Sequence, residues 1–434
     1  MGAANASATA AAPLRSDDWP TYHGSNYRSG SNAHVMPVTA KFRQFINLRL
    51  DGPVYGSPII ANQSTIVATE NNTVYRLYGN RVLWSRHLGV PVPRSALPCG
   101  NIDPNGITGT PAYDYLTNTV VVVGLVNTPI RHVAFGLDPL SGALRWSRTV
   151  DVPNTAGIDP KAMQQRGALI VYGHYVYIAY GGLAGDCSAY RGSVVGVDLQ
   201  SPTTSALWHY TVPTSREAGI WAAGGPTAAQ PGGLFVAVGN GATADSGAYD
   251  YSDSILRLYN QQRVDSFSPA VWRTDNRNDL DLGSQSPAPI GRWVFAAGKN
   301  GNAYVLDAAR LGGIGGQVWQ GPLCRSFGGT AAEAPNFVYV PCTDGVRKVR
   351  INSNGSLDVM WRASANVNGS PVLGGGRVWA LDPSAGVLHA LDPATGADRG
   401  QWATGAVTRF ATPALWHSAI YVPTTTGAVA YRWD

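Results

Sequence analysis

The chain has little lysine, little glutamate and little charge of either sign. Lysine occurs four times and glutamate three times in 434 residues, and the four charged residue types make up 14% of the chain, against about 25% in an average protein. Because Lys and Glu are strong helix formers, a mainly helical protein is excluded. The 51 glycines and 29 prolines, with many Val, Thr, Tyr and Trp residues, favour a sheet protein with many turns.

Several classes of protein are excluded by what the sequence does not contain. No apolar run approaches the roughly 18 residues of a transmembrane helix. The arginines behind the net charge of +5 are scattered, and no segment combines dense Arg and Lys with aromatic residues, which excludes nucleic acid as a partner. The sequence has no haem-attachment motif, no Gly-x-Ser-x-Gly elbow and no phosphate-binding loop.

The cysteines and the N-terminal residues indicate the cellular compartment of the protein. Cys99 and Cys187 lie in long loops and are expected to staple them, while Cys324 and Cys342 are expected to bridge neighbouring strands; four free thiols are the alternative. The even count fits an oxidising compartment, so we expect a secreted or extracytoplasmic protein. Residues 1–18, rich in Ala and Ser and without the apolar core of a signal peptide, are expected to form a flexible tail before one domain, 19–434.

One unit recurs along the chain and predicts the architecture. It runs through apolar strands to a Leu-Asp-Pro-x-(Thr/Ser)-Gly turn and ends on Trp, most clearly at 133–146 and 388–402. Seven tryptophans end such units, at 84, 146, 208, 272, 319, 361 and 402. Spacings of about 40–65 residues with three or four short strands each are typical of propeller blades. The Trp is expected on each outer strand, where it fills the wedge between blades.

The end of the chain predicts how the ring closes. After Trp402 three more strands are expected, at 408–413, 419–423 and 428–433, without an outer strand. Residues 41–50 precede the first blade and belong to none, so we expect them to complete the last one. The fold class is therefore an all-β, eight-bladed β-propeller closed by an N-terminal strand, which leaves no open ring edge.

Unusually long loops indicate where a site would lie. They are expected on one face of the ring, at 90–108, 152–166, 181–193, 213–233 and 240–253. Polar residues in these loops and near the starts of blades are candidates to line an axial pocket: Arg94, Asp103, Glu217, Trp221, Arg325 and Arg409. We expect Trp221, Arg325 and Arg409 to bind a cofactor and Glu217 to act in acid–base chemistry, with a surface loop charge as the alternative for Glu217.

The repeat, together with Asp18-Trp19-Pro20-Thr21-Tyr22-His23-Gly24, resembles the pyrroloquinoline-quinone (PQQ) type propellers, which include quinoprotein alcohol dehydrogenases and many non-enzymatic relatives. The resemblance implies PQQ and Ca²⁺ on the ring axis. Lys299 in Gly298–Asp307 matches the residue that touches the quinone oxygen, and Asp281 or Asp279 matches the catalytic base. A solvated turn is the alternative for both segments.

The metal ligands implied by the resemblance are less complete. Asn240 in Gly239-Asn240-Gly241 matches an amide ligand, and Asp275 and Asp281 offer the oxygen donors that Ca²⁺ prefers. Cys187 stands where the family has a ligating glutamate, with Asp186 beside it, and the family's Cys-Cys pair is absent. These departures leave three hypotheses open.

The three hypotheses share an axial pocket for a small molecule in a monomeric propeller. The first is a quinone-dependent oxidoreductase acting on an alcohol. The second is a non-redox enzyme that uses Glu217, an Asp of 275–281 and Lys299 for acid–base chemistry. The third is a binding or scaffold propeller without catalysis.

Overall fold

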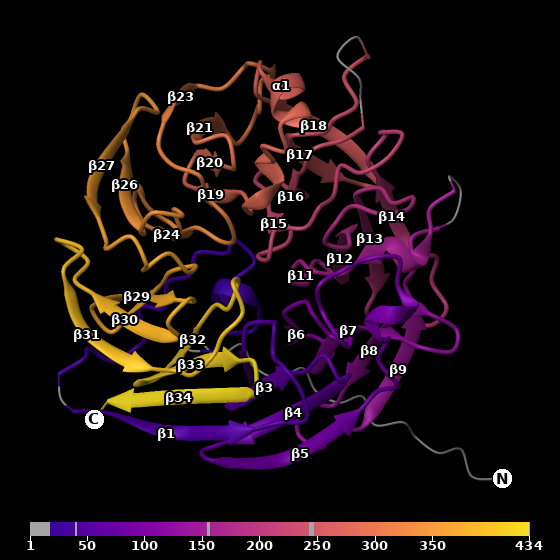
Figure 1. Ribbon diagram of the computed structural model, residues 1–434, viewed down its shortest axis with the longest axis vertical. Helices are drawn as coiled ribbons and strands as arrows, with labels where there is room; N and C mark the ends of the chain where they lie inside the picture. Colours follow the sequence, from indigo (N-terminus) through magenta and orange to yellow (C-terminus); the bar gives the residue numbers. More distant parts are fainter. Residues whose placement is uncertain (1–17, 40, 154–156, 243–246, 434) are drawn as a thin grey trace.

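Apolar strands from the repeats pair into eight sheets arranged as blades around a central axis (Figure 1). This computed structural model describes residues 18–39, 41–153, 157–242 and 247–433. The middle strands of the blades are buried on both sides because a neighbouring blade covers each face; all eight residues of β7 (Thr119–Val126) are buried. The outer strand β5 (Arg81–His87) is exposed at every position except a half-buried Trp84.

Each blade runs from an inner to an outer strand. The first four blades are β2 (Ile59–Ala61), β3 (Ser64–Ala68), β4 (Thr73–Tyr78), β5; β6 (Ala112–Asp114), β7, β8 (Arg131–Leu137), β9 (Leu144–Thr149); β11 (Ile170–Tyr172), β12 (Tyr175–Gly182), β13 (Ser193–Asp198), β14 (Trp208–Thr211), with β10 (Met163–Gln164) also on β12; and β15 (Thr227–Ala228), β16 (Leu234–Val238), β17 (Ser254–Tyr259), β18 (Gln262–Ser268), β22 (Gly313–Ile314).

The other four blades are β19 (Ala288–Ile290), β20 (Trp293–Ala297), β21 (Asn302–Asp307), β23 (Trp319–Pro322); β24 (Ala331–Glu333), β25 (Phe337–Val340), β26 (Arg347–Ile351), β27 (Leu357–Arg362); β28 (Val372–Gly374), β29 (Arg377–Asp382), β30 (Val387–Leu391), β31 (Asp398–Ala403); and β32 (Ala414–Trp416), β33 (Ala419–Thr424), β34 (Gly427–Trp433), β1 (Phe42–Arg49). Short helices are η1 (Tyr22–Gly24), η2 (Arg94–Ala96), η3 (Pro160–Ala162), α1 (Trp272–Arg277) and η4 (Leu282–Ser284).

The ring closes as the sequence predicts. The N-terminal strand β1 pairs antiparallel with the C-terminal strand β34, from Phe42 opposite Trp433 to Arg49 opposite Gly427, and the two lie side by side in Figure 1. The expected strand at 408–413 is wrong: those residues form a turn, with the Ala411 N–H donating to the Thr408 carbonyl at 3.0 Å. The inner strand begins after Pro413 instead.

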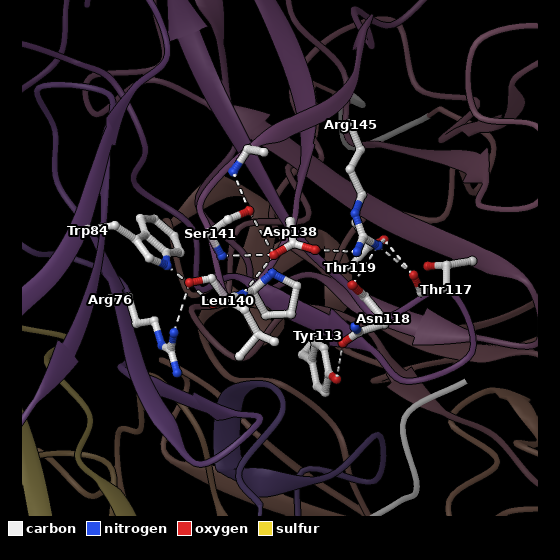
Figure 2. A network of polar contacts seen from close by, with 12 residues as sticks. Arg76, Trp84, Tyr113, Thr117, Asn118, Thr119, Asp138, Leu140, Ser141 and Arg145 are labelled. Atoms are coloured by element: carbon white, nitrogen blue, oxygen red, sulfur yellow. Dashed lines mark hydrogen bonds and ion pairs between the residues drawn. The ribbon is translucent and has the colours of Figure 1, made fainter. Parts of the chain in front are cut away.

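Two of the repeat tryptophans, Trp84 and Trp361, dock between blades through the Asp-Pro turn of the next blade. Trp84 of the first blade donates its indole N–H to the Pro139 carbonyl at 3.3 Å (Figure 2). Asp138 holds that turn by accepting the Ser141 N–H at 2.8 Å. Trp361 repeats the contact with Pro393, at 3.0 Å. One expectation is wrong: Trp272 lies on α1 rather than on an outer strand, because the chain continues from β18 into a longer connection.

A substitution at Gly142 tests how much the contact between Trp84 and the Asp-Pro turn stabilises the protein. It has φ +68°, and an added Cβ would lie 2.6 Å from the Trp84 ring. We expect Gly142→Ala to lower the free energy of unfolding by about 2 kcal/mol, because an L residue is strained at positive φ and the indole must move. Gly79 has φ +54° and open space around its Cβ position, so Gly79→Ala shows the backbone strain alone. Equal losses of unfolding free energy for the two variants, measured by urea unfolding, would mean that the Trp84 contact does not stabilise the protein.

The segment from Trp19 to Met36, here called the plug segment, closes one end of the central channel. Tyr22 is buried, and its hydroxyl lies 3.1 Å from the Thr412 hydroxyl of the eighth blade. An added Cβ on Gly224 or Gly329, in other blades, would contact the same ring. Tyr22 therefore lies on the axis, touched from several sides of the ring.

Arg28 fixes the plug segment to the blades. Its guanidinium is buried and donates to the carbonyls of Leu169 at 3.0 Å and Pro226 at 3.2 Å, and to the Thr21 hydroxyl at 2.7 Å. Residues 1–17 of the expected tail lie outside the described residues, and Asp18 is buried. In the part of the chain that is described, no helix has the length and apolar character to cross a membrane.

Candidate functional site

The predicted site residues gather at the end of the ring opposite the plug segment. This end is formed by the turns between the second and third strand of each blade and by the connections between blades. Lys299 lies in the β20–β21 turn, and Asp279 and Asp281 lie in the connection before η4. The long loops noted in the sequence belong mainly to these same connections and turns, so they lie on the same face of the ring as the predicted site residues.

Asp281 and Lys299 form the centre of the cluster. The Lys299 Nζ lies 2.5 Å from Asp281 Oδ2 and 2.7 Å from Asp279 Oδ1. Asp281 Oδ1 accepts the backbone N–H of Asn240 at 2.6 Å. The side chain of Asp281 is 4% exposed and that of Asp279 is 70% exposed. Asp281 is thus a buried carboxylate with both oxygens engaged, whereas Asp279 is a surface group.

The charges of this pair follow from burial and proximity. Burial raises the pKa of Asp281 above its ordinary value, and the Lys299 ammonium opposes that rise. Burial alone would lower the pKa of Lys299, but the carboxylates of Asp281 and Asp279 outweigh it, so the pKa of Lys299 is raised. Lys299 therefore carries its charge at neutral pH, held at a fixed point of the axial face.

Trp221 and Glu217 lie near this pair. The Lys299 Nζ is 5.7 Å from the centroid of the Trp221 ring. Burial raises the pKa of Glu217, with Arg216 opposing at 2.9 Å and the carboxylates of Asp186 and Asp281 adding to the rise. Trp221, Asn240, Asp281, Lys299 and Glu217 therefore share one electrostatic neighbourhood, assembled from two blade connections and two turns.

A further acid, Asp253, was not found from the sequence. It is fully buried behind Asp281, and burial followed by the Asp281 charge raises its pKa well above the ordinary value. Its Oδ1 accepts the Leu282 N–H at 3.0 Å. Burial and the neighbouring Asp281 carboxylate thus both disfavour a negative charge on Asp253, while Lys299 favours it. No sequence signal marked Asp253, since it is one Asp in a polar loop.

The proposed calcium donors do not converge. Asp275 lies on α1 and accepts the Asn300 side chain at 2.8 Å, and Asp186 accepts the Tyr190 hydroxyl. Within the described residues, no three His, Cys, Asp or Glu side chains lie close enough to hold a metal ion. Asp281 is already paired with Lys299. The predicted donors thus engage other residues in this structure, and their assignment as calcium ligands stays a prediction.

Both expected disulfides are confirmed. Cys99 bonds to Cys187, and Cys324 bonds to Cys342. The first staples the connection between the first two blades to the β12–β13 loop. The second joins the connection before β24 to the turn after β25, rather than two strands as expected. Cys187, in the position of the family's glutamate ligand, is covalently engaged and cannot bind a metal.

Arg409 lines a cavity of about 330 Å³ on this face. The cavity, here called the axial cavity, lies between the connections and turns of the last blades and is lined by Phe327, Pro341, Thr343, Asn368, Ser370, Pro383, Ser384, Arg409 and Phe410. The Arg409 guanidinium lies 4.2 Å from the Phe327 centroid and 5.3 Å from the Phe410 centroid. Arg325, predicted beside it, is exposed and is not among the lining residues.

Arg166 and Glu70 are functional candidates that the sequence did not single out. The Arg166 guanidinium lies 4.7 Å from the centroid of Phe410, so two arginines share that ring. Burial lowers the pKa of Arg166, and Glu70 opposes the fall. Glu70 is buried, and burial raises its pKa from 4.5 to about 7 although the Gly106 N–H, the Thr108 hydroxyl and Arg166 favour its charged form. Phe410 also meets Trp221 edge-on, with 6.3 Å between centroids.

Comparison with known proteins agrees with the fold. Residues 43–225 match a family model described as outer membrane protein assembly factor BamB. Quinohemoprotein alcohol dehydrogenase ADHIIG from Pseudomonas putida HK5 is 14% identical with a TM-score of 0.72, covering 96% of this chain and 80% of that chain. No curated protein matches the chain.

Two further structures are similar. A europium-containing methanol dehydrogenase is 15% identical with a TM-score of 0.69, covering 95% of this chain and 91% of that chain. BamB from Moraxella catarrhalis is 16% identical with a TM-score of 0.63, covering 91% of this chain and 100% of that chain. Identities this low establish the fold and leave the activity open. Residues 43–225 thus resemble the BamB family model, and the chain as a whole has the β-propeller fold of the quinoprotein alcohol and methanol dehydrogenases.

Proposed function

We propose that this protein is an extracytoplasmic propeller that binds a planar, anionic small molecule in its axial cavity. The observation that carries the proposal is the pair Arg409 and Arg166 over Phe410. Arg409 is exposed, and no hydrogen bond or ion pair joins its guanidinium to another described residue, whereas Arg166 is half-buried and has Glu70 as an electrostatic partner. A bound carboxylate or phosphate would accept charge-assisted hydrogen bonds from the Arg409 guanidinium, and the charge of Arg166 across the Phe410 ring would add to the attraction. The two disulfides support the extracytoplasmic location.

The shape of the cavity favours a flat ligand. Aromatic rings at Phe327 and Phe410 provide faces for stacking, and Arg409 lies where it can meet an acidic substituent. Lys299 adds positive charge beyond Trp221, but its partners Asp281 and Asp279 neutralise it. The ligand's negative charge is therefore expected to meet the arginines rather than the lysine.

The test is a calorimetric titration with PQQ, a planar tricarboxylate, and with benzene-1,3,5-tricarboxylate, each with and without Ca²⁺. We expect saturable binding without Ca²⁺ that weakens as salt is raised. Arg409→Met should weaken it by about 10- to 100-fold, the loss of a charge-assisted hydrogen bond. Arg325→Met, outside the cavity, is the matched control. If neither anion binds, or if both variants behave alike, the proposal is wrong.

A second candidate, an oxidoreductase acting on an alcohol, is supported by the gathering of Trp221, Asn240, Asp281 and Lys299 at one end of the axis. When bound, PQQ would supply a two-electron acceptor. In that case Lys299 holds a positive charge at the axis and Asp281 is the nearest buried carboxylate. An alcohol panel with an artificial electron acceptor distinguishes the candidates: PQQ binding without turnover supports the binding protein alone.

A further inference from the structure

A second cavity lies on the opposite face of the ring, between the third and fourth blades. It has a volume of about 320 Å³, and its lining includes Tyr172, Tyr175, Tyr177, Trp208, Tyr259 and Gln261. The β11–β12 and β17–β18 turns that border it join other strand ends than the turn that carries Lys299. This cavity, here called the aromatic groove, is therefore separate from the axial cavity.

The rings of the groove are arranged by a glycine. Gly196 on β13 pairs with Tyr177 on one side and with Trp208 on the other. An added Cβ at Gly196 would lie 3.0 Å from the Trp208 side chain and 3.2 Å from the Tyr177 ring. Without it, the two rings meet edge to face at 5.1 Å. Tyr175 lies 5.8 Å from Tyr177, so three aromatic side chains form one continuous wall.

Three phenol side chains of the groove make no hydrogen bond through their hydroxyls to another residue in the described ranges. Tyr172, Tyr175 and Tyr177 are each half-buried. Burial raises the pKa of Tyr177 to about 12. The β17–β18 turn adds the side chain of Gln261, which is exposed at the rim. A ligand that fills the groove must therefore offer hydrogen-bonding groups, since an apolar ligand would bury these hydroxyls unsatisfied.

The absence of charged side chains from the groove indicates which class of ligand it can bind. No charged side chain is among the residues that line it, so neither an anion nor a cation would find a partner there. A flat apolar face combined with hydroxyl and amide groups is complementary to a neutral ring that has C–H groups on its faces and hydroxyls on its edge. We propose that the aromatic groove binds a neutral saccharide, through stacking on Tyr177 and Tyr259 and hydrogen bonds to the phenols and Gln261.

The test uses neutral disaccharides: cellobiose, maltose and N,N′-diacetylchitobiose. Binding to the full chain is followed by ligand-observed NMR and calorimetry at sugar concentrations up to about 10 mM, ten times a 1 mM dissociation constant. We expect at least one disaccharide to bind saturably. Tyr259→Ala should weaken that binding about tenfold through loss of a stacking face. Tyr177→Phe, which removes only a hydroxyl, should weaken it about fivefold.

The repeat offers a matched control. Tyr78 ends β4 in the first blade, as Tyr259 ends β17 in the fourth, and the two are 63% and 51% exposed. Tyr78→Ala should leave sugar binding unchanged, and Tyr259→Ala should leave anion binding in the axial cavity unchanged. Absence of saturable binding by all three disaccharides would overturn the proposal. Binding that Tyr259→Ala and Tyr177→Phe do not alter would place the sugar elsewhere and overturn it equally.

Discussion

Replacing both Cys99 and Cys187 with alanine is expected to lower the free energy of unfolding by about 4–5 kcal/mol. The disulfide closes a loop with a sequence separation of 88 residues, and removing it restores that loop's entropy to the unfolded chain. Both cysteines are only half-buried, so little packing is lost with them. Urea unfolding of the variant and the unmodified protein, both under non-reducing conditions, measures the effect.

The second disulfide provides the comparison. Cys324 and Cys342 close a loop with a separation of only 18 residues, for which chain entropy predicts about 3 kcal/mol. Cys342 is fully buried, so its replacement adds a packing cost that the first pair lacks. A loss below about 1 kcal/mol for the Cys99–Cys187 pair would show that its two loops are held together by other contacts.

Glu70→Gln is expected to stabilise the protein at pH 8 by about 3 kcal/mol and to leave its stability nearly unchanged at pH 4.5. The pKa of Glu70 rises from 4.5 in the unfolded chain to about 7 in the folded protein, chiefly through burial. Between these two values the folded state holds a proton that the unfolded state has lost. The free energy of unfolding therefore falls as pH rises from 4.5 to 7 and stays low above pH 7. The total fall is about 1.36 kcal/mol for each unit by which the folded-state pKa is raised.

Urea unfolding of both proteins at pH 4.5, 6 and 8 tests this prediction. The difference in free energy between Glu70→Gln and the unmodified protein should grow with pH and level off above pH 7. Glu333→Gln, the same change at a half-buried carboxylate that accepts the Tyr339 hydroxyl at 2.6 Å, is the control for losing one negative charge. A constant difference across the pH range would show that Glu70 is ionised throughout.

Much of the fold could be predicted from the sequence because each blade corresponds to a local sequence repeat. The Asp-Pro turn and the Trp of each unit act within about a hundred residues, as the Trp84–Pro139 contact shows. Counting the strands after Trp402 was enough to assign 41–50 to the last blade. The errors at 408–413 and at Trp272 arose where a blade connection departs from the repeat, and only the tertiary structure shows how that connection runs.

The site was less accessible to sequence reasoning. Lys299 and Asp281 were found by resemblance, but their mutual ion pair, which occupies both, depends on a blade connection meeting the β20–β21 turn. Arg166, Glu70 and Asp253 carried no motif at all. Their properties come from burial, and burial is decided by neighbours that are far away in the chain.

The sequence by itself thus determined the eight-bladed ring and its closure, because strand periodicity and turn residues are local signals, whereas the even cysteine count only allowed the two disulfides that the structure shows. The tertiary structure decided which charges are paired, which acids are buried, and that the plug segment places Tyr22 on the axis. The physical reason is that desolvation and Coulomb interactions depend on distances in space. Those distances are set only when all eight blades close around one axis.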